Sequence, residues 1–144
     1  MNKFYSIIVV CTILLFGSNQ VVADVQVIAH PSVNIDSLSQ RDLSRIYVNQ
    51  MKFWSDQNRL TVFSHSTKSP ILREFSVAKL RMQPHQLSRV WKRLTFSGTG
   101  RAPVMVKTEK EMLQKIISTP GSIGYVLDTV NVDNVSLKKI DIQQ

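Results

Sequence analysis

Strand-like and helix-like patterns alternate along this chain, and the alternation restricts the fold more than any other sequence feature. Apolar and β-branched runs predict strands at residues 25–29, 60–63, 123–126 and 136–142. Helical patterns lie between them, and no long hairpin signal interrupts the order. Strands that alternate with helices favour an α/β layer fold. We therefore expect helices on both faces of a small sheet.

The expected helices begin at residues that cap helix N-termini. Ser39 precedes Asp42 and Thr108 precedes Glu111 at the capping-box spacing, and Ser69 is followed by proline. The predicted apolar stripes are Leu43, Ile46 and Tyr47; Ile71, Phe75, Ala78 and Met82; Leu87, Val90, Trp91 and Leu94; and Met112, Leu113, Ile116 and Ile117. Each stripe predicts the helix face that packs on the sheet.

Residues 1–23 have the layout of a secretory signal peptide. Lys3 gives a positive start, residues 4–16 are almost wholly apolar, and Val21-Val22-Ala23 offers small or modest residues before a cleavage point at Asp24. The apolar run is too short for a spanning helix, which needs about 20 residues. We therefore expect a periplasmic protein whose mature domain, residues 24–144, has no transmembrane segment.

The chain offers little for catalysis. Cys11 lies in the predicted signal peptide, so the mature chain has no thiolate nucleophile and no disulfide. The histidines, His30, His65 and His85, are not at metal-ligand spacing, and no Gly-x-Ser-x-Gly motif is present. We expect a protein that is not an enzyme and that holds no metal and no cofactor.

The charge is strongly basic and uneven. Residues 59–115 contain 12 Lys or Arg against three Glu. Such a face attracts phosphate, acidic lipid, acidic protein or nucleic acid, or it is simply a solvated surface. The aromatic residues fit core positions better than a base-stacking platform. Nucleic acid is therefore not the expected partner.

The strongest candidate for a binding site is the segment at residues 64–70, SHSTKSP. It follows a predicted strand and enters a helix N-terminus, where unpaired N–H groups and the helix dipole favour an anion. The candidate ligand-binding residues are Ser64, His65, Ser66, Thr67, Ser69 and, one turn into the helix, Arg73. The alternative is that Ser69 only caps its helix and that the rest is a polar loop.

A second, weaker candidate is the segment at residues 97–101, SGTGR. Its two glycines allow the backbone to approach a ligand, and Arg101 can offer a guanidinium fork to an oxyanion. No Gly-Lys-Ser/Thr follows, so this is not a P-loop. The alternative is a flexible connection between a helix and a strand.

Three segments, in order and spacing, resemble phosphate ABC transporter substrate-binding proteins. Residues 39–47 (SQRDLSRIY) followed by 53–56 (FWSD) resemble the family's L-x-x-I-F-x-G-x-x-x-W-x-D stretch. Residues 60–75 are similar to the strand, loop and helix that carry its S-G-T loop. Residues 118–126 (STPGSIGYV) are similar to its PGaIGYv strand and are the sharpest match. The resemblance spans residues 25–126.

The resemblance implies a three-layer α-β-α single lobe of the type II periplasmic-binding-protein-like fold, with a small mixed sheet. Family members bind phosphate between two lobes, whereas this chain has the length of one lobe. Ser69 stands where the family has serine, Pro70 replaces glycine, and Ile71 falls where threonine is expected. His65 or a neighbour stands in place of an arginine, for which Arg73 can compensate.

Two functions follow from these features. The first is a solute-binding module that binds phosphate or a related oxyanion for an ABC importer, with its inner-membrane permease, or for a sensor. The second is an envelope interaction module that keeps the fold and has lost the ligand. The hydroxyl-rich helix start favours the first function. The altered motif and the missing lobe favour the second.

Export can be tested directly. The secreted protein should have the intact mass of a chain that begins at Asp24, because cleavage is expected after Ala23. Soluble cytoplasmic protein that retains Met1 would contradict the signal-peptide interpretation.

Overall fold

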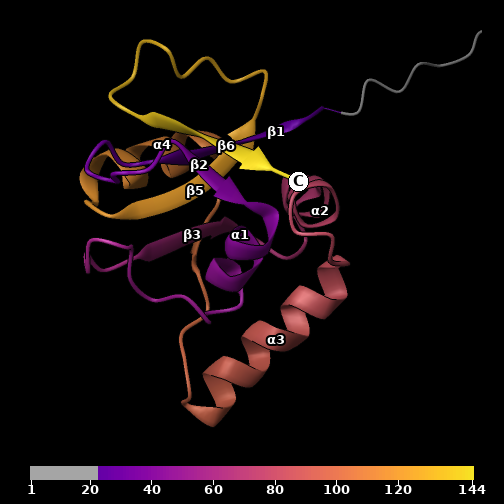
Figure 1. Ribbon diagram of the computed structural model, residues 1–144. Coiled ribbons are helices and arrows are strands. Elements are labelled where there is room, and N and C mark those ends of the chain that lie inside the picture. The colour runs from indigo at the N-terminus through magenta and orange to yellow at the C-terminus, as the bar shows by residue number, and fades with distance from the viewer. Residues whose placement is uncertain (1–22) are drawn as a thin grey trace, which may run out of the picture.

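A computed structural model describes residues 23–144, so the predicted signal peptide lies almost wholly outside the described residues. The elements, in chain order, are β1 (Val25–Ala29), β2 (Ser37–Ser39), α1 (Gln40–Tyr47), β3 (Thr61–His65), α2 (Pro70–Ala78), α3 (Pro84–Ser97), β4 (Val104–Val106), α4 (Glu109–Ser118), β5 (Ser122–Leu127) and β6 (Lys138–Gln143) (Figure 1). Among these residues, no helix is long and apolar enough to cross a membrane.

The strands form one mixed sheet in the order β2-β6-β1-β5-β3-β4. β1 is antiparallel to both β5 and β6, whereas β3 is parallel to β5 and β4, and β2 is parallel to β6. The prediction of an α/β fold with a small mixed sheet is confirmed. The two edge strands, β2 and β4, were not predicted, because three residues are too few to show a period-two pattern.

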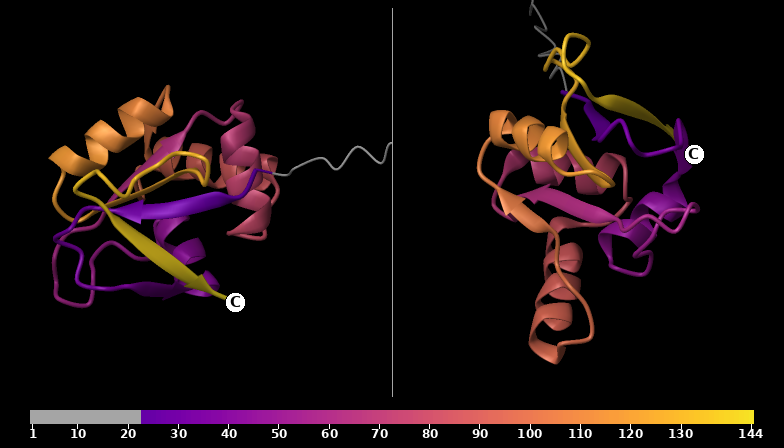
Figure 2. Two further views of the ribbon diagram at one scale, coloured as in Figure 1. Left: turned by 90° about the horizontal axis from the view of Figure 1, so that it is seen from above. Right: turned by 90° about the vertical axis from the view of Figure 1, so that its left-hand side faces the viewer.

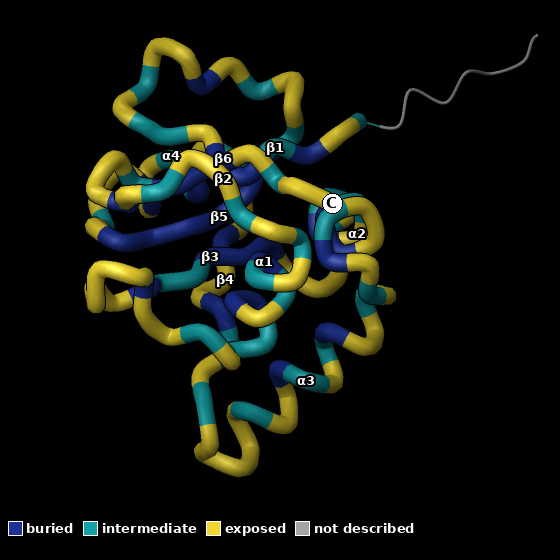
Figure 3. Tube along the Cα trace, in the orientation of Figure 1, coloured by how far each residue is buried: buried dark blue, intermediate teal, exposed yellow. Residues whose placement is uncertain are grey.

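Helices cover both faces of the sheet, which gives the predicted three layers (Figure 2). Side chains alternate along β1: Val27 and Ala29 enter the core beneath α1, α2 and α3, while Ile28 enters the core beneath α4. Along β5, Tyr125 and Val126 divide between the same two cores. β5 is therefore buried along most of its length (Figure 3).

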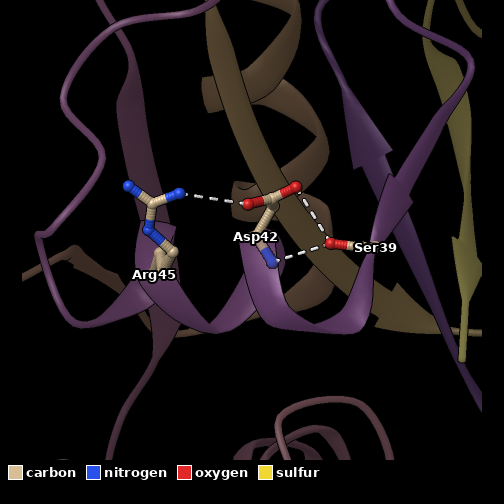
Figure 4. Close-up of polar contacts among 3 residues, drawn as sticks. All are labelled: Ser39, Asp42 and Arg45. Carbon is tan, nitrogen blue, oxygen red and sulfur yellow. Dashed lines mark hydrogen bonds and ion pairs between the residues drawn. The ribbon is translucent and has the colours of Figure 1, made fainter.

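The predicted helix caps form. Ser39 Oγ accepts the N–H of Asp42 at 3.1 Å, and Arg45 pairs with Asp42 at 3.3 Å one turn later (Figure 4). Thr108 Oγ1 accepts the N–H of Glu111 at 3.0 Å. The carboxylate of Glu111 accepts the N–H of Lys107 instead of that of Thr108, so this capping box is only half formed.

The predicted stripe of α2 is only partly right: Phe75 is buried and Ile71 packs against the core partly buried, but Leu72 and Ser76 were missed. The buried residues are Leu72, Phe75 and Ser76, whereas Ala78 is exposed. The helix ends at Ala78, and Arg81 follows with φ of +52°. Met82 therefore lies beyond the end of α2 and cannot belong to a face of that helix.

The two glycines of the PGSIGYV segment, Gly121 and Gly124, are each required for a different steric reason. Gly121 has φ of +75°, and a Cβ there would lie 2.4 Å from the carbonyl oxygen of Arg59. A Cβ on Gly124 would lie 2.5 Å from the sulfur of Met112 on α4. Gly121 therefore permits the close turn before β5, and Gly124 lets α4 pack directly on the strand.

Tyr125 is the centre of the larger core. Its ring stacks on Phe75 of α2 at a centroid distance of 3.7 Å, and Phe75 meets Tyr47 of α1 edge to face. Its hydroxyl accepts the backbone N–H of His65 at 3.2 Å and bonds Ser64 Oγ at 2.9 Å. One side chain of β5 therefore joins two helices to the end of β3.

His65 is buried at the end of β3, with only 2% of its surface exposed. Within the described residues, its Nε2 atom has no hydrogen-bond partner. Burial lowers the pKa of the imidazole, because the charged form would lose its hydration. The ring is therefore neutral in the folded protein at neutral pH.

α3 projects from the body of the molecule (Figure 3), and only a few of its side chains pack against the core. Leu87 and Trp91 are its buried side chains, and the indole Nε1 donates to the carbonyl oxygen of Tyr47 at 2.8 Å. Val90 and Leu94 pack against this core partly buried, and Lys92 and Arg93 face solvent. The predicted stripe of this helix is confirmed.

Trp91→Ala should lower the free energy of unfolding by about 3–5 kcal/mol, because it empties a core position and removes the bond to Tyr47. Urea denaturation of the two proteins measures this difference. Lys92→Ala on the exposed face is the matched control and should change stability by less than about 0.5 kcal/mol. A loss below about 1 kcal/mol for Trp91→Ala would show that α3 is not anchored there.

Stability should fall as the pH falls below about 6.5, the ordinary histidine pKa expected in the unfolded chain. Between that value and the lowered pKa of folded His65, the unfolded chain binds the additional proton. Urea midpoints from pH 7.5 to 5 measure the effect. His65→Gln should flatten this dependence, whereas His85→Gln at an exposed position should retain it. Equal slopes in all three proteins would exclude His65 as the cause.

Candidate functional site

The residues of the SHSTKSP segment divide into an inner and an outer group. Ser64 and His65 belong to β3 and are buried, and Ser64 Oγ and the backbone N–H of His65 both bond the hydroxyl of Tyr125. Thr67 and Ser69 line an open pocket at the start of α2, together with Arg73. The strand was predicted to end at Phe63, and its extension to His65 removes two of the candidate residues from the surface.

We call this surface the helix-start pocket. It has a volume of about 490 Å³, and its lining residues are Thr67, Lys68, Ser69, Pro70, Arg73, Gln83, Pro84 and His85. None of them is acidic, and Lys68 and Arg73 are cations. Ser66 is exposed beside the pocket and does not line it.

Two helices begin at this pocket. Ser69 is the N-cap of α2 and Gln83 is the N-cap of α3, and each is followed by proline at the first helical position. The N-terminal end of a helix carries a partial positive charge, so both helices favour an anion at the pocket. Their dipoles add to the charges of Lys68 and Arg73.

The backbone donors of the loop are largely engaged within the loop itself. Ser69 N–H donates to the carbonyl oxygen of Ser66 at 2.8 Å, and Ile71 N–H donates to Ser69 Oγ at 3.2 Å. Proline at the first helical position of both helices has no N–H to offer. Side chains, chiefly Thr67, Lys68, Ser69 and Arg73, are therefore the main donors that the pocket offers to a ligand.

Lys68, Gln83 and His85 complete the pocket and were not among the predicted site residues. Lys68 was visible in the same segment as a cation at a helix start. Gln83 and His85 belong to the next helix, and only the packing of α3 beside α2 brings them to this place. No pattern in the sequence predicts that the start of α3 packs beside the start of α2.

Arg101 lies in a different pocket. This strand-start pocket has a volume of about 410 Å³, and its lining residues are Ile46, Tyr47, Asn49, Met51, Lys52, Phe53, residues 59–62 and residues 98–104. α3 separates the two pockets: Pro84 and His85 at its start line one, and Gly98 just beyond its end lines the other. A helix of 14 residues is about 21 Å long. Arg101 and Arg73 therefore belong to separate surfaces.

No group of three or more His, Cys, Asp or Glu side chains within residues 23–144 is placed to hold a metal ion. The buried Tyr47 and Tyr125 hydroxyls have raised pKa values because burial disfavours the phenolate, so both remain protonated hydrogen-bonding groups.

Comparison with known proteins gives a likeness in structure only. No protein-family model matches the chain, and no curated protein matches it in sequence. Solved structures do match. PstS from Borrelia burgdorferi superposes with a TM-score of 0.60 at 16% identity, over 84% of this chain and 47% of that one.

Two further structures agree. A putative phosphate ABC transporter substrate-binding protein with bound phosphate, from Clostridium perfringens, has a TM-score of 0.61 at 12% identity, over 83% of this chain and 44% of that one. A possible phosphate binding protein from Planctomyces limnophilus has a TM-score of 0.63 at 15% identity, over 84% and 42%. The chain spans less than half the length of these proteins. It therefore has the fold of one lobe of the phosphate ABC transporter substrate-binding proteins.

Proposed function

We propose that residues 24–144 form an exported, non-enzymatic solute-binding module that binds phosphate or a related oxyanion at the helix-start pocket. One observation carries the proposal: two helix N-termini and two cations, Lys68 and Arg73, meet in a pocket whose lining residues include no carboxylate. The likeness in fold to phosphate-binding proteins supports the same ligand class.

The donors of the pocket suit a tetrahedral oxyanion. Arg73 offers a guanidinium fork, Lys68 offers an ammonium group, and Thr67 and Ser69 offer hydroxyl hydrogens. His85 adds a ring nitrogen from α3. Recognition then depends on side chains, because the neighbouring N–H groups of Ser69 and Ile71 are already paired.

The altered motif is consistent with this arrangement. His65, near the position of the family's arginine, is buried and carries no charge that could reach the pocket. Arg73 stands one helical turn inside α2 and lines the pocket, so it supplies the guanidinium that His65 cannot supply. The module would pass its ligand to an importer or a sensor in the periplasm.

Phosphate titration of the mature protein tests the proposal. We expect saturable binding of phosphate or sulfate, and Arg73→Ala should weaken it about ten-fold or more. A lost charge-assisted hydrogen bond costs about 1.5–3 kcal/mol, and about 1.4 kcal/mol is ten-fold in affinity. Isothermal titration calorimetry at low salt measures both proteins, and added salt should weaken binding.

Two variants control for the general loss of positive charge. Arg89→Ala removes a cation on the exposed face of α3, and Arg101→Ala removes one in the other pocket. Neither should change phosphate affinity by more than about two-fold, since neither residue lines the helix-start pocket. If the wild-type protein shows no saturable oxyanion binding even at millimolar concentration, the envelope interaction module replaces this proposal.

A further inference from the structure

We propose that the strand-start pocket is a second binding site, and that its ligand is a small amphipathic anion: a carboxylate, sulfonate or phosphate group carried on an apolar body. The inference concerns residues that the oxyanion site does not use. It does not depend on phosphate binding at the helix-start pocket.

Positive charge gathers in this pocket without compensation. Lys52, Arg59 and Arg101 line it, and none of its lining residues is acidic. The ion pairs found among residues 23–144 use other cations, namely Arg45, Lys79, Lys138 and Lys139. Three like charges around one concavity repel each other and raise the local potential, and a bound anion relieves that repulsion.

Alongside polar residues such as Asn49 and Thr99, the lining includes apolar side chains that a purely inorganic ion would leave uncovered. Met51, Leu60 and Val62 form part of the wall. Phe53 and Val104 also line it and are 54% and 51% exposed, although both are large apolar side chains. Covering apolar surface releases free energy in proportion to its area. A volume of about 410 Å³ lies in the range of pockets that bind small organic molecules.

The backbone that carries Arg59 and Arg101 is fixed. Asn49, with φ of +61°, accepts the N–H of Arg101 on its side-chain oxygen at 3.2 Å. A Cβ on Gly100 would lie 2.6 Å from that oxygen, so the loop sits directly against Asn49. An antiparallel bridge between Phe53 and Arg59 holds the segment that carries the second cation. A fixed frame lowers the entropy cost of binding.

The test uses the fluorescent aromatic sulfonate 8-anilinonaphthalene-1-sulfonate with the folded mature protein. We expect saturable fluorescence, and the double variant Arg59→Gln/Arg101→Gln should weaken binding at least ten-fold. The matched control, Lys92→Gln/Arg93→Gln, removes the same charge from exposed residues of α3 that do not line the pocket. Its affinity should stay within about two-fold, and thermal melts confirm that both variants fold.

Competition identifies the ligand chemistry. Octanoate should displace the probe, whereas octanol, which has the apolar chain without the charge, should displace it at least ten-fold less well. Inorganic phosphate should not displace it, and Arg73→Ala should leave probe binding unchanged. The proposal is overturned by an absence of saturable binding, by an equal loss in the Lys92/Arg93 control, or by displacement with phosphate. None of these outcomes bears on phosphate binding at the helix-start pocket, which calorimetry measures separately.

Discussion

The hydrogen bonds made by the buried hydroxyl of Tyr125 hold in place the end of the molecule that carries the helix-start pocket. They fix the last two residues of β3, Ser64 and His65, against β5. Because the loop at residues 66–69 follows immediately, its starting point is set by this contact. The same ring stacks on Phe75, which orients α2 and therefore the helix start that Ser69 caps. Burial raises the pKa of the phenol, so the hydroxyl stays protonated over the working pH range.

Sequence patterns predicted most of this architecture because the elements are long enough to show their periods. β1 and β5 and the starts of three helices at Ser39, Ser69 and Thr108 are in the predicted places. The two strands that were missed share one cause. β2 and β4 are three residues long, and each forms by pairing with a strand that is distant in the sequence. A pattern of neighbouring residues cannot predict such a pairing.

The candidate site was predictable only in part. Thr67, Ser69 and Arg73 do share a pocket, as expected from a strand that leads into a helix start. Ser64 and His65 looked like loop residues because they are polar, but they continue a central strand between β4 and β5 and face the interior. Arg101 was a separate candidate, predicted from its glycine-rich loop and its guanidinium group, and it lines the other pocket. The length of α3 separates Arg101 from the helix-start pocket. The sequence predicts that length, but it does not predict the direction in which the helix runs.

If the helix-start pocket binds an oxyanion as proposed, its open, one-lobe form limits the affinity that the pocket can reach. A tetrahedral ion seated there meets protein donors on one side, and its remaining oxygens stay in water. Millimolar binding corresponds to about 4 kcal/mol and micromolar binding to about 8 kcal/mol. Side-chain donors such as Arg73 and Lys68 must also lose their own hydration and rotamer freedom. Micromolar or tighter binding therefore requires further donors that exclude water from the free side. A second protein surface that closes over the pocket would supply these donors. The affinity of the isolated chain therefore measures what share of the binding free energy this lobe contributes by itself.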